Sequence, residues 1–267
     1  MGMSSSAATV APDCESLDSL VERFGPSPAL FLDYDGTLAP IQPRPEQATL
    51  SEDVRRTLQQ LAQRYPVAIV SGRERTDVED LVGLPGLIYA GSHGLDIAGP
   101  GVRWDSPEAG HLLPTLDQAF DRLLEDTGSA SGILIERKRY AVAVHYRLAA
   151  EGDKQLAWES VERVCQSMSG LRLAKGKKVW ELRPDIDWDK GRAIEWLCAQ
   201  LRRSEPASYL PVFIGDDVTD EDGFRSVAGL GGVGVLVADT PRPSAATCRV
   251  PSSAAVAGLL EALQNRA

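Results

Sequence analysis

Short apolar runs that end abruptly in polar residues recur along this chain. Four of them lie at residues 28–32, 66–70, 87–90 and 210–214, and each leads into a polar or glycine-containing segment. Continuous apolarity, unlike strict alternation, is typical of strands that are buried on both faces of a parallel sheet. Each run therefore predicts a buried strand whose carboxyl end opens into a polar loop.

Helical patterns separate these predicted strands. Residues 51–64 place three apolar side chains on one face and begin with Ser51, a good N-cap residue. Residues 76–82 and 189–203 are further helical segments. The alternation of strands and helices predicts an α/β core, doubly wound around a parallel sheet.

The pattern changes in the middle of the chain. Residues 133–138 and 140–147 alternate between apolar and polar positions and lie almost back to back, as in a β-hairpin. Two helices and two more short strands complete this block, at residues 111–126, 153–167, 171–174 and 178–183.

These elements predict an inserted α+β domain. We place it at residues 108–184, within a core made of residues 27–107 and 185–267. We expect residues 1–26, which are rich in serine and alanine, to form a flexible N-terminal segment.

Composition excludes several classes of protein. The chain has 267 residues, enough for one large or two moderate domains, and a net charge of -10, which argues against a general nucleic-acid binder. No apolar run reaches the ~18 residues of a membrane helix, and the first residues lack the basic start of a signal peptide. The four cysteines have no CxxC spacing, which fits a reducing compartment. We expect a cytoplasmic protein without a membrane or nucleic-acid partner.

Four polar motifs follow the predicted strands or begin a predicted helix. Their members are Asp33, Asp35 and Thr37; Ser71 and Gly72; Lys190; and Asp216, Asp217 and Asp220. Ligand sites of open α/β sheets lie at the carboxyl ends of the strands. Carboxylates crowded at such a site need a cation or a shared proton, and Mg²⁺ prefers their hard oxygens. A hydroxyl and an ammonium group suit phosphate oxygens.

Each motif alone also has a simpler interpretation. Asp, Gly and Thr are ordinary turn residues, Ser71 is equally suited to cap a helix, and most lysines are solvated. The four motifs in this order, each at a predicted strand end or helix start, favour a site for phosphoryl transfer.

With these motifs the chain resembles the haloacid dehalogenase (HAD) superfamily of aspartyl phosphatases, from about Ala29 onward. The resemblance implies a Rossmann-like core with an inserted cap domain. It implies that Asp33 is the nucleophile and forms an aspartyl-phosphate, and that Asp35 is the acid and base. It implies a Mg²⁺ site made by Asp33, Asp35 (through its backbone carbonyl), Asp216 and Asp217, with Asp220 in support. It also implies a phosphate site made by Thr37, Ser71, Gly72 and Lys190, with Arg73 in support.

Longer segments resemble the trehalose-6-phosphate phosphatase family within that superfamily. They are DYDGTLAPI from Asp33, GSHGLD from Gly91, IERKRYAVAVHYR up to Arg147, WELRP from Trp180 and WDKG from Trp188. The resemblance implies hydrolysis of trehalose 6-phosphate to trehalose and phosphate, as in trehalose biosynthesis. The chain departs from the family at Asp96, where glutamate is common, and at Arg137, which makes the hairpin turn unusually basic.

The inserted domain offers candidate sugar-binding residues. The predicted strand 140–147 places His145 and Arg147 on one face with two alanines, while Glu136 and Lys138 share a face of the preceding strand. Such charges on an open sheet face are usually only solvated, although they also suit sugar hydroxyls. The resemblance implies that Glu136, Lys138 and Glu181 contact the sugar. His145 and Arg147 are candidates either for the same role or for bracing the domain.

Three alternatives to this assignment remain open. The chain is also compatible with a phosphatase for sucrose or mannosyl phosphates, with a phosphomutase, and with a non-catalytic sensor of sugar phosphates. The leading hypothesis is a monomer that acts on a small-molecule sugar phosphate.

Overall fold

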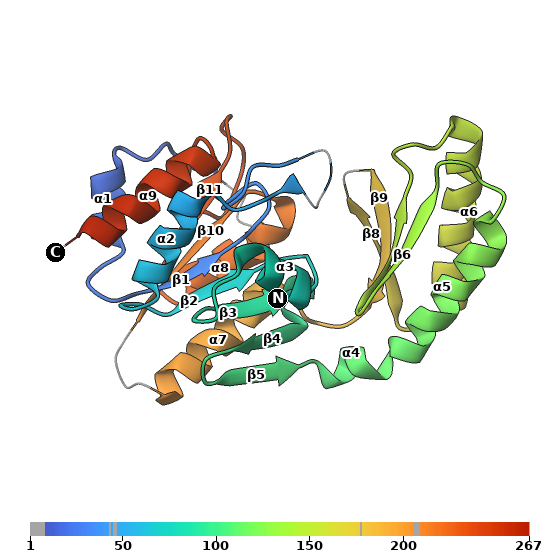
Figure 1. Ribbon diagram of the computed structural model, residues 1–267, viewed down its shortest axis with the longest axis horizontal. Coiled ribbons are helices and arrows are strands. Elements are labelled where there is room, and N and C mark those ends of the chain that lie inside the picture. Colours follow the sequence, from blue (N-terminus) through green and yellow to red (C-terminus); the bar gives the residue numbers. More distant parts are fainter. Residues whose placement is uncertain (1–8, 43, 45–46, 177, 205–208, 267) are drawn as a thin grey trace, which may run out of the picture. The chain divides into compact units, whose positions relative to one another are not determined.

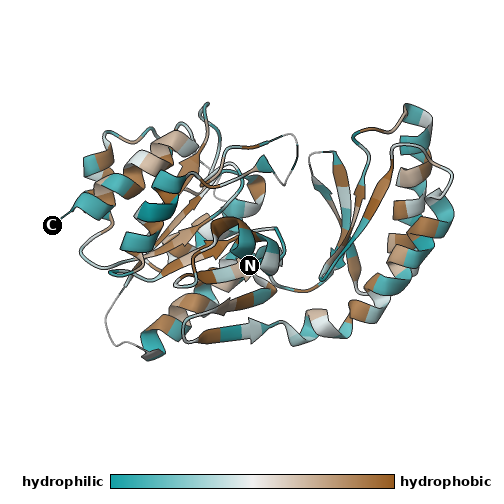
Figure 2. Ribbon diagram, in the orientation of Figure 1, coloured by the Kyte–Doolittle hydropathy of each residue, from teal (hydrophilic) through white to brown (hydrophobic). Residues whose placement is uncertain are grey.

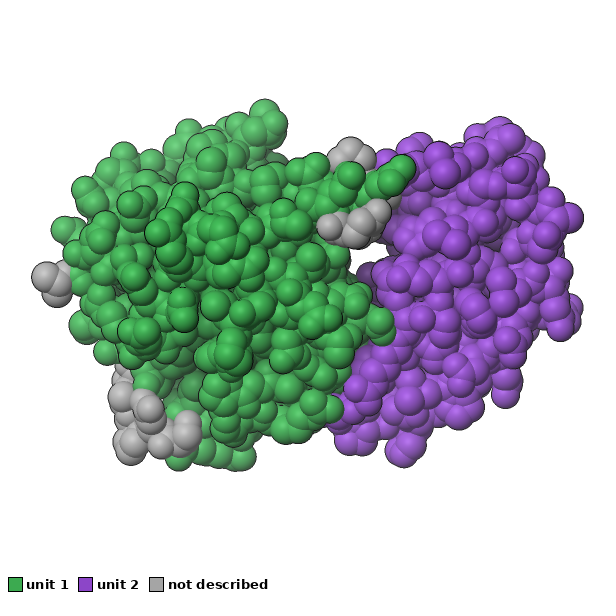
Figure 3. Space-filling model, viewed as in Figure 1, with its two compact units in different colours: residues 1–104, 188–267 green, residues 105–187 purple. Residues whose placement is uncertain are grey.

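The computed structural model describes residues 9–42, 44, 47–176, 178–204 and 209–266. The chain divides into two compact units, which Figure 3 colours separately. The first contains Met1–Trp104 and Trp188–Ala267, and the second contains Asp105–Asp187. The predicted insertion, residues 108–184, falls within the limits of the second unit.

The first unit is built around one large sheet (Figure 1). Its strands are β1 (Pro28–Leu32), β2 (Val67–Val70), β3 (Ile88–Gly91), β4 (Asp96–Gly99), β5 (Val102–Asp105), β10 (Leu210–Gly215), β11 (Val233–Val237) and β12 (Cys248–Val250). Its helices are α1 (Leu17–Arg23), α2 (Glu52–Leu61), α3 (Arg75–Val82), α7 (Lys190–Ser204), α8 (Glu221–Gly229) and α9 (Ser253–Asn265), with the short 3-10 helices η2 (Ser92–Gly94) and η3 (Val218–Asp220).

The strand order is β12-β11-β10-β1-β2-β3-β4-β5. The pairs from β12 to β3 are parallel, and β4 pairs antiparallel with β3. The chain winds from β1 through β2 to β3 on one side, and later from β10 through β11 to β12 on the other. The winding direction therefore reverses between β1 and β10, which is the position where doubly wound sheets bind ligands. The predicted fold class is confirmed.

Apolar side chains cover both faces of this sheet. Leu30 and Leu32 of β1 belong to one core with α1, α2 and α9, whereas Phe31 belongs to a second core with α7 and α8. Figure 2 shows the central strands of this sheet mainly in brown, for hydrophobic residues, and the helices in both brown and teal. Burial on both faces explains why the sequence of β1 is apolar without interruption.

The second unit has its own sheet and its own core. Its elements are α4 (Pro107–His111), α5 (Leu113–Thr127), β6 (Leu134–Lys138), β7 (Ala141–His145), α6 (Glu151–Ser167), β8 (Leu171–Gly176) and β9 (Val179–Pro184). The antiparallel sheet has the order β6-β7-β9-β8. Val142, Val144, Trp180 and Leu182 pack with apolar residues of α5 and α6. The residues that alternate with them, including Ala143 and Glu181, therefore lie on the opposite face.

Two expectations about these elements were wrong. Part of the segment that we expected to be flexible is ordered, because residues Leu17–Arg23 form α1 and bury Leu20, while Phe24 is buried just after it. The second hairpin strand ends at His145 and does not continue to Arg147. The helix predicted from Ser51 does begin there, with its hydroxyl accepting the Val54 N–H at 3.3 Å.

Within the described part of the chain, none of the helices combines the length and the apolarity that crossing a membrane requires.

Candidate active site

Asp33 and Asp35 lie in a tight loop directly after β1. The Asp33 N–H donates to the carbonyl of Ile214 on β10, at 2.9 Å, so the parallel pairing continues to the first residue of the motif. The loop then turns at Gly36, whose φ of +83° is a conformation that glycine adopts readily. A Cβ at Gly36 would lie 2.1 Å from Oδ2 of Asp216, so glycine is needed for space as well.

Lys190 holds the Asp33 carboxylate from the start of α7. Its Nζ lies 2.7 Å from Oδ1 of Asp33 and 2.7 Å from Oδ1 of Asp220, and all three side chains are buried. Burial alone would lower the pKa of Lys190, but the two carboxylates outweigh it and raise the pKa above its ordinary value. Lys190 is therefore a permanent cation at this site.

Asp220 also fixes the loop that follows β10. Its Oδ2 accepts the backbone N–H groups of Asp216, at 3.0 Å, and Asp217, at 2.9 Å. Asp220 is completely buried, and both of its oxygens are occupied by these bonds and by Lys190. It positions the other groups and has little capacity left for a ligand.

Three carboxylates gather here around one ammonium group. Oxygens of Asp33, Asp216 and Asp220 lie within 4.8 Å of one another. Burial, followed by the charges of Asp220 and Asp217, raises the pKa of Asp216 to about 7. Burial likewise raises the pKa of Asp33 well above its ordinary value, although Lys190 opposes that shift.

This group fits a divalent cation. When all three carboxylates are ionised, Lys190 leaves two negative charges uncompensated in a buried place. Oδ1 of Asp216 is buried and has no hydrogen-bond partner among the described residues. Hard oxygen ligands of this kind suit Mg²⁺.

Asp217 differs from the other acidic residues of this loop. It is exposed, and its side chain accepts the Asp220 N–H in a capping box at the start of η3. The structure therefore places Asp220, for which the sequence predicts a supporting role, in the carboxylate group, and places the predicted metal ligand Asp217 at a helix cap.

The predicted phosphate-binding residues lie around the same strand ends. Ser71 follows β2, the neighbour of β1, and is almost completely buried, with its Oγ accepting the Arg73 N–H at 3.1 Å. A Cβ at Gly72 would lie 2.9 Å from the ring of His93, so glycine leaves space for that ring. Thr37 is buried, and its Oγ1 has no hydrogen-bond partner among the described residues.

Arg73 holds Asp35 with both of its donor arms. Nε donates to Oδ2 and Nη2 donates to Oδ1, each at 2.6 Å. The Arg73 guanidinium also lies over the Tyr34 ring, 5.5 Å from its centre. In this arrangement both oxygens of Asp35 face a guanidinium, so the carboxylate must leave Arg73 before it can exchange a proton with a substrate.

The second unit gathers most of the predicted sugar-binding residues on the sheet face opposite its helices. Lys138 Nζ donates to Oε1 of Glu181 at 3.0 Å, and the His145 ring nitrogen lies 2.9 Å from Oε2 of Glu136. Burial would raise the pKa of Glu181, but Arg183 and Lys138 outweigh it and lower the pKa. These five side chains form one charged network across β6, β7 and β9.

The predicted residue Arg147, and the two residues at which the sequence departs from the family, lie apart from both groups. Arg147 is exposed and follows the end of β7, so it does not share a strand face with His145. Arg137 points toward the helix side, where it pairs with Asp117 of α5 at 2.8 Å. Asp96 is buried in the first unit and accepts from Nε of Arg75 at 2.9 Å, which gives it a structural role.

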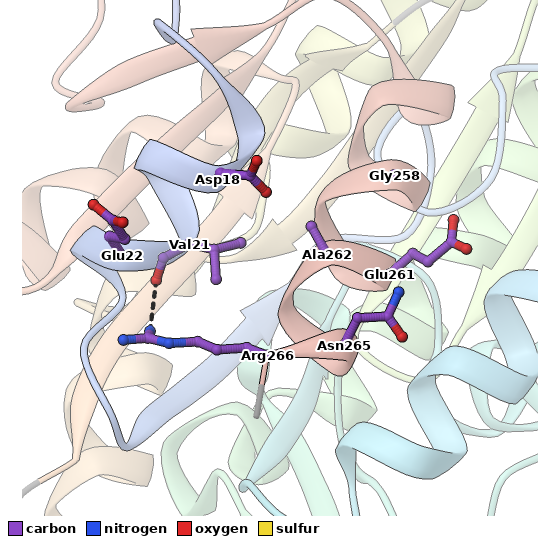
Figure 4. Close-up of a pocket in the computed structure, with 8 residues that line it drawn as sticks. All are labelled: Asp18, Val21, Glu22, Gly258, Glu261, Ala262, Asn265 and Arg266. Carbon is purple, nitrogen blue, oxygen red and sulfur yellow. Dashed lines mark hydrogen bonds between the residues drawn. The ribbon is translucent and has the colours of Figure 1, made fainter.

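A cavity of about 570 Å³ lies on the first unit between α1 and α9 (Figure 4). Asp18, Glu22 and Glu261 are among its lining residues, and Arg266 crosses its edge to donate to the Val21 carbonyl at 2.9 Å. None of the predicted site residues lines this cavity, so it is separate from the group of Asp33, Asp216 and Asp220.

Comparison with known proteins gives consistent matches. The family model described as trehalose-phosphatase matches residues 31–254. A trehalose-phosphate phosphatase of Mycobacterium marinum is 44% identical over 236 residues, which are 87% of this chain and 60% of the relative. One of Mycobacterium tuberculosis is 41% identical over 253 residues, which are 93% of this chain and 63% of the relative. The chain thus spans about three fifths of the length of these relatives.

The fold has solved counterparts. The C-terminal domain of a trehalose-6-phosphate phosphatase from C. albicans superimposes with a TM-score of 0.79. It is 24% identical in sequence, and the match covers 98% of this chain and all of that domain. This likeness is evidence for the fold, including the presence of a second unit, and not for the substrate.

Proposed function

The chain belongs to the trehalose-phosphatase family, and from that premise we propose that it hydrolyses trehalose 6-phosphate to trehalose and inorganic phosphate. The observation that carries the proposal is the buried group of Asp33, Lys190 and Asp220, in which an ammonium lies 2.7 Å from the carboxylate of Asp33. A phosphatase of this type needs a nucleophile held in place beside a cation in a water-poor site.

Asp33 is the nucleophile in this proposal. Its carboxylate oxygen attacks phosphorus, the bond to the sugar oxygen breaks, and an aspartyl-phosphate forms on Asp33. Lys190, which is already fixed beside Asp33, compensates the negative charge of the phosphoryl group. The buried hydroxyls of Ser71, which follows β2, and of Thr37, in the loop after β1, are further proposed donors for phosphate oxygens.

Asp35 carries the protons. It gives a proton to the departing sugar oxygen and then takes one from the water that hydrolyses the aspartyl-phosphate. Asp35 is half-exposed, unlike Asp33, and can therefore reach water. The contact with Arg73 orients the ionised carboxylate before substrate binds. It is broken before catalysis, so that Asp35 can take up from water the proton that it gives to the sugar oxygen.

Mg²⁺ is the proposed metal. Asp33 and Asp216 would hold it through carboxylate oxygens, with the backbone carbonyl of Asp35 as the third ligand that the family resemblance implies. When bound, the ion supplies positive charge that stabilises the phosphoryl oxygens in the transition state. Asp220 keeps Asp216 and Lys190 in place, and Asp217 stabilises the start of η3.

The charged network of the second unit is the proposed sugar site. Glu136, Lys138 and Glu181 present carboxylate and ammonium groups on one sheet face, and these groups complement the donors and acceptors of sugar hydroxyls. His145 braces Glu136 at 2.9 Å. Arg147, which is exposed beyond the strand, is left with no specific role in this proposal.

A substrate panel tests the sugar assignment. Initial rates are measured with trehalose 6-phosphate, sucrose 6-phosphate, a mannosyl phosphate and glucose 6-phosphate at equal concentration and saturating Mg²⁺. We expect kcat/KM for trehalose 6-phosphate to exceed the others at least tenfold. Equal rates on glucose 6-phosphate would contradict the assignment, and a preference for another sugar phosphate would identify the alternative phosphatase.

A single substitution tests the chemistry. We expect Asp33→Asn to abolish turnover while the protein remains folded and still binds the sugar phosphate, because the amide is not a nucleophile. Removal of metal with EDTA should stop turnover of the unmodified protein, and added Mg²⁺ should restore it. Activity in the Asp33→Asn protein would refute the nucleophile, and activity in metal-free protein would refute the metal role.

A further inference from the structure

The loop that carries Asp216 has a contact from outside the four motifs. Arg242, in the connection between β11 and β12, donates from Nη2 to the backbone carbonyl of Asp216 at 3.0 Å. It also donates from Nη1 to Oε1 of Glu221, the first residue of α8, at 3.1 Å. We propose that Arg242, paired with Glu221, is a positioning residue that sets the orientation of the Asp216 carboxylate for the metal. The inference rests on the metal role in the proposed function.

The Asp216 backbone is held from both sides. On the N–H side, Oδ2 of Asp220 accepts from Asp216 and Asp217. On the carbonyl side, Arg242 is the donor. These three bonds fix the peptide planes next to Asp216, so only the side-chain torsions of Asp216 remain to be set. A ligand group held in this way loses little conformational entropy when the ion binds.

The segment that presents Arg242 is stiff. Arg242 lies between Pro241 and Pro243, and proline fixes its own φ and restricts the residue before it. The Arg242 carbonyl accepts the Ala11 N–H at 3.4 Å, and Glu221 accepts the Ala245 N–H through its other oxygen at 2.8 Å. The arginine therefore projects from an anchored loop, as a positioning residue requires.

The pair is also balanced in charge. An isolated guanidinium beside the Asp216 loop would repel a metal cation, but Glu221 neutralises Arg242 at 3.1 Å. The two arms of the guanidinium serve two acceptors at once, which the compact ammonium group of lysine cannot do with the same geometry. The contact thus contributes orientation without adding net positive charge.

Mg²⁺ binding tests this inference without requiring turnover. Isothermal titration calorimetry measures the Kd for Mg²⁺ in the full chain and in Arg242→Gln, Arg242→Lys and Glu221→Gln. Loss of a group that orients a metal ligand costs on the order of 10-fold in metal affinity or more. We expect Arg242→Gln to weaken Mg²⁺ binding about tenfold and Glu221→Gln to weaken it as well. Arg242→Lys should restore only a small part of the loss.

Arg225→Gln is the matched control. Arg225 lies on α8, pairs with Asp222 and has a side chain that is 62% exposed, so its loss should leave the Kd unchanged. The melting temperature in EDTA is measured for every variant to separate bracing from positioning. A lower melting temperature with an unchanged Kd in Arg242→Gln would overturn the inference, because Arg242 would then only brace the loop.

The remaining outcomes separate this inference from the proposed function. Full affinity in Arg242→Lys would overturn it, since charge alone would then explain the effect. If Arg242→Gln does not fold, an unchanged Kd in Glu221→Gln would overturn it. An unmodified chain that binds no Mg²⁺ would overturn both this inference and the metal assignment. Weaker Mg²⁺ binding in the variants, in a chain that hydrolyses no sugar phosphate, would support the inference and reject the substrate.

Discussion

We call the cluster of Asp33, Lys190, Asp216 and Asp220 the Asp33 group. Its arrangement favours chemistry at the expense of stability. Three carboxylates, two of them buried and that of Asp216 partly buried, face one ammonium, and burial raises the pKa of Asp33 well above its ordinary value. A raised pKa means that the ionised carboxylate is less stable in the folded chain than in the unfolded chain. Conflicts of this kind are typical of functional sites.

The first prediction follows from this charge imbalance. Asp33→Asn should increase the free energy of unfolding in EDTA at pH 7, by about 1 kcal/mol or more, because it removes one of the crowded charges while its Oδ1 can still accept from Lys190. The gain should disappear as the pH falls below about 3.9, where the carboxyl of the unfolded chain also becomes protonated. Urea titrations of both proteins across this pH range measure it.

Asp80→Asn is a suitable control for this titration. Asp80 is exposed on α3, so its neutralisation should change the unfolding free energy only slightly. Excess Mg²⁺ should reduce or reverse the advantage of Asp33→Asn, because the ion stabilises only a site with its ligands intact. A destabilised Asp33→Asn protein in EDTA would show that the carboxylate group is not under electrostatic strain.

Gly36 gives a second prediction at the same scale. Gly36→Ala should lower activity at least tenfold, because the new Cβ would lie 2.1 Å from Oδ2 of Asp216 and force that carboxylate to move. Gly101→Ala is the matched control: its φ is +71°, and a Cβ there meets nothing within 4 Å. In both variants, alanine at a positive φ destabilises the chain by about 1 kcal/mol. Equal activities of the two variants would contradict the role of Gly36 at Asp216.

Among the secondary-structure elements, those with a clear local hydrophobic pattern were predicted from the sequence, and those that depend on distant contacts were not. β1 and β10 were predicted because strands covered on both faces are continuously apolar. β12 has only three residues, and its burial depends on contacts with distant segments, so no local signal marks it. The hairpin strand β7 ended earlier than predicted, because alternation continues to Arg147 although strand pairing stops at His145.

The site was predictable to a similar degree. Asp33, Ser71 and Asp216 follow buried strands, and the strand order places the carboxyl ends of these strands side by side, independent of the loop conformations. The roles of Asp220 and Arg242 depend on hydrogen bonds that side chains make across loops. Such contacts leave little trace in a single sequence, apart from the two prolines that flank Arg242.

The charged network across β6, β7 and β9 gives the third prediction. Glu181→Gln should destabilise the chain at pH 7 by about 1–3 kcal/mol, because it leaves the partly buried cations Lys138 and Arg183 without a full partner. The pKa of Glu181 is lowered in the folded chain, so this stabilisation exists above the unfolded pKa of about 4.3 and is lost as the pH falls through the lower folded value.

Unfolding titrations at pH 7 and pH 3 test this pH dependence. The difference between the unmodified chain and Glu181→Gln should shrink markedly at the lower pH. Glu125→Gln is the control, because Glu125 is exposed on α5 and its contact with Arg122 is 3.8 Å long. A difference that is equal at both pH values would show that charge on Glu181 does not stabilise the sheet.

In the molecule as a whole, the second unit is inserted between two residues that touch each other. Trp104 and Trp188 are the last and first residues of the first unit on either side of the insertion, and their rings stack with centres 4.1 Å apart. Trp188 is anchored further by donating to the Gly94 carbonyl at 2.9 Å. The two crossing points are thus fixed side by side within the first unit, whatever the second unit does.

This arrangement predicts that the two units can be separated. A chain in which a short Gly-Ser linker replaces the residues between Trp104 and Trp188 should fold. Each unit has its own core, and the stacked rings show that the two residues to be linked are already close together. It should keep Mg²⁺ binding and slow hydrolysis of p-nitrophenyl phosphate, since the Asp33 group lies entirely in the first unit. Its preference for trehalose 6-phosphate should fall roughly 100-fold, which corresponds to ~3 kcal/mol of sugar binding.

Circular dichroism and assays with both substrates, carried out beside the intact chain, measure the folding and the activity of the shortened chain. A shortened chain that still prefers trehalose 6-phosphate would place the sugar site in the first unit, because the charged network of β6, β7 and β9 would then be absent.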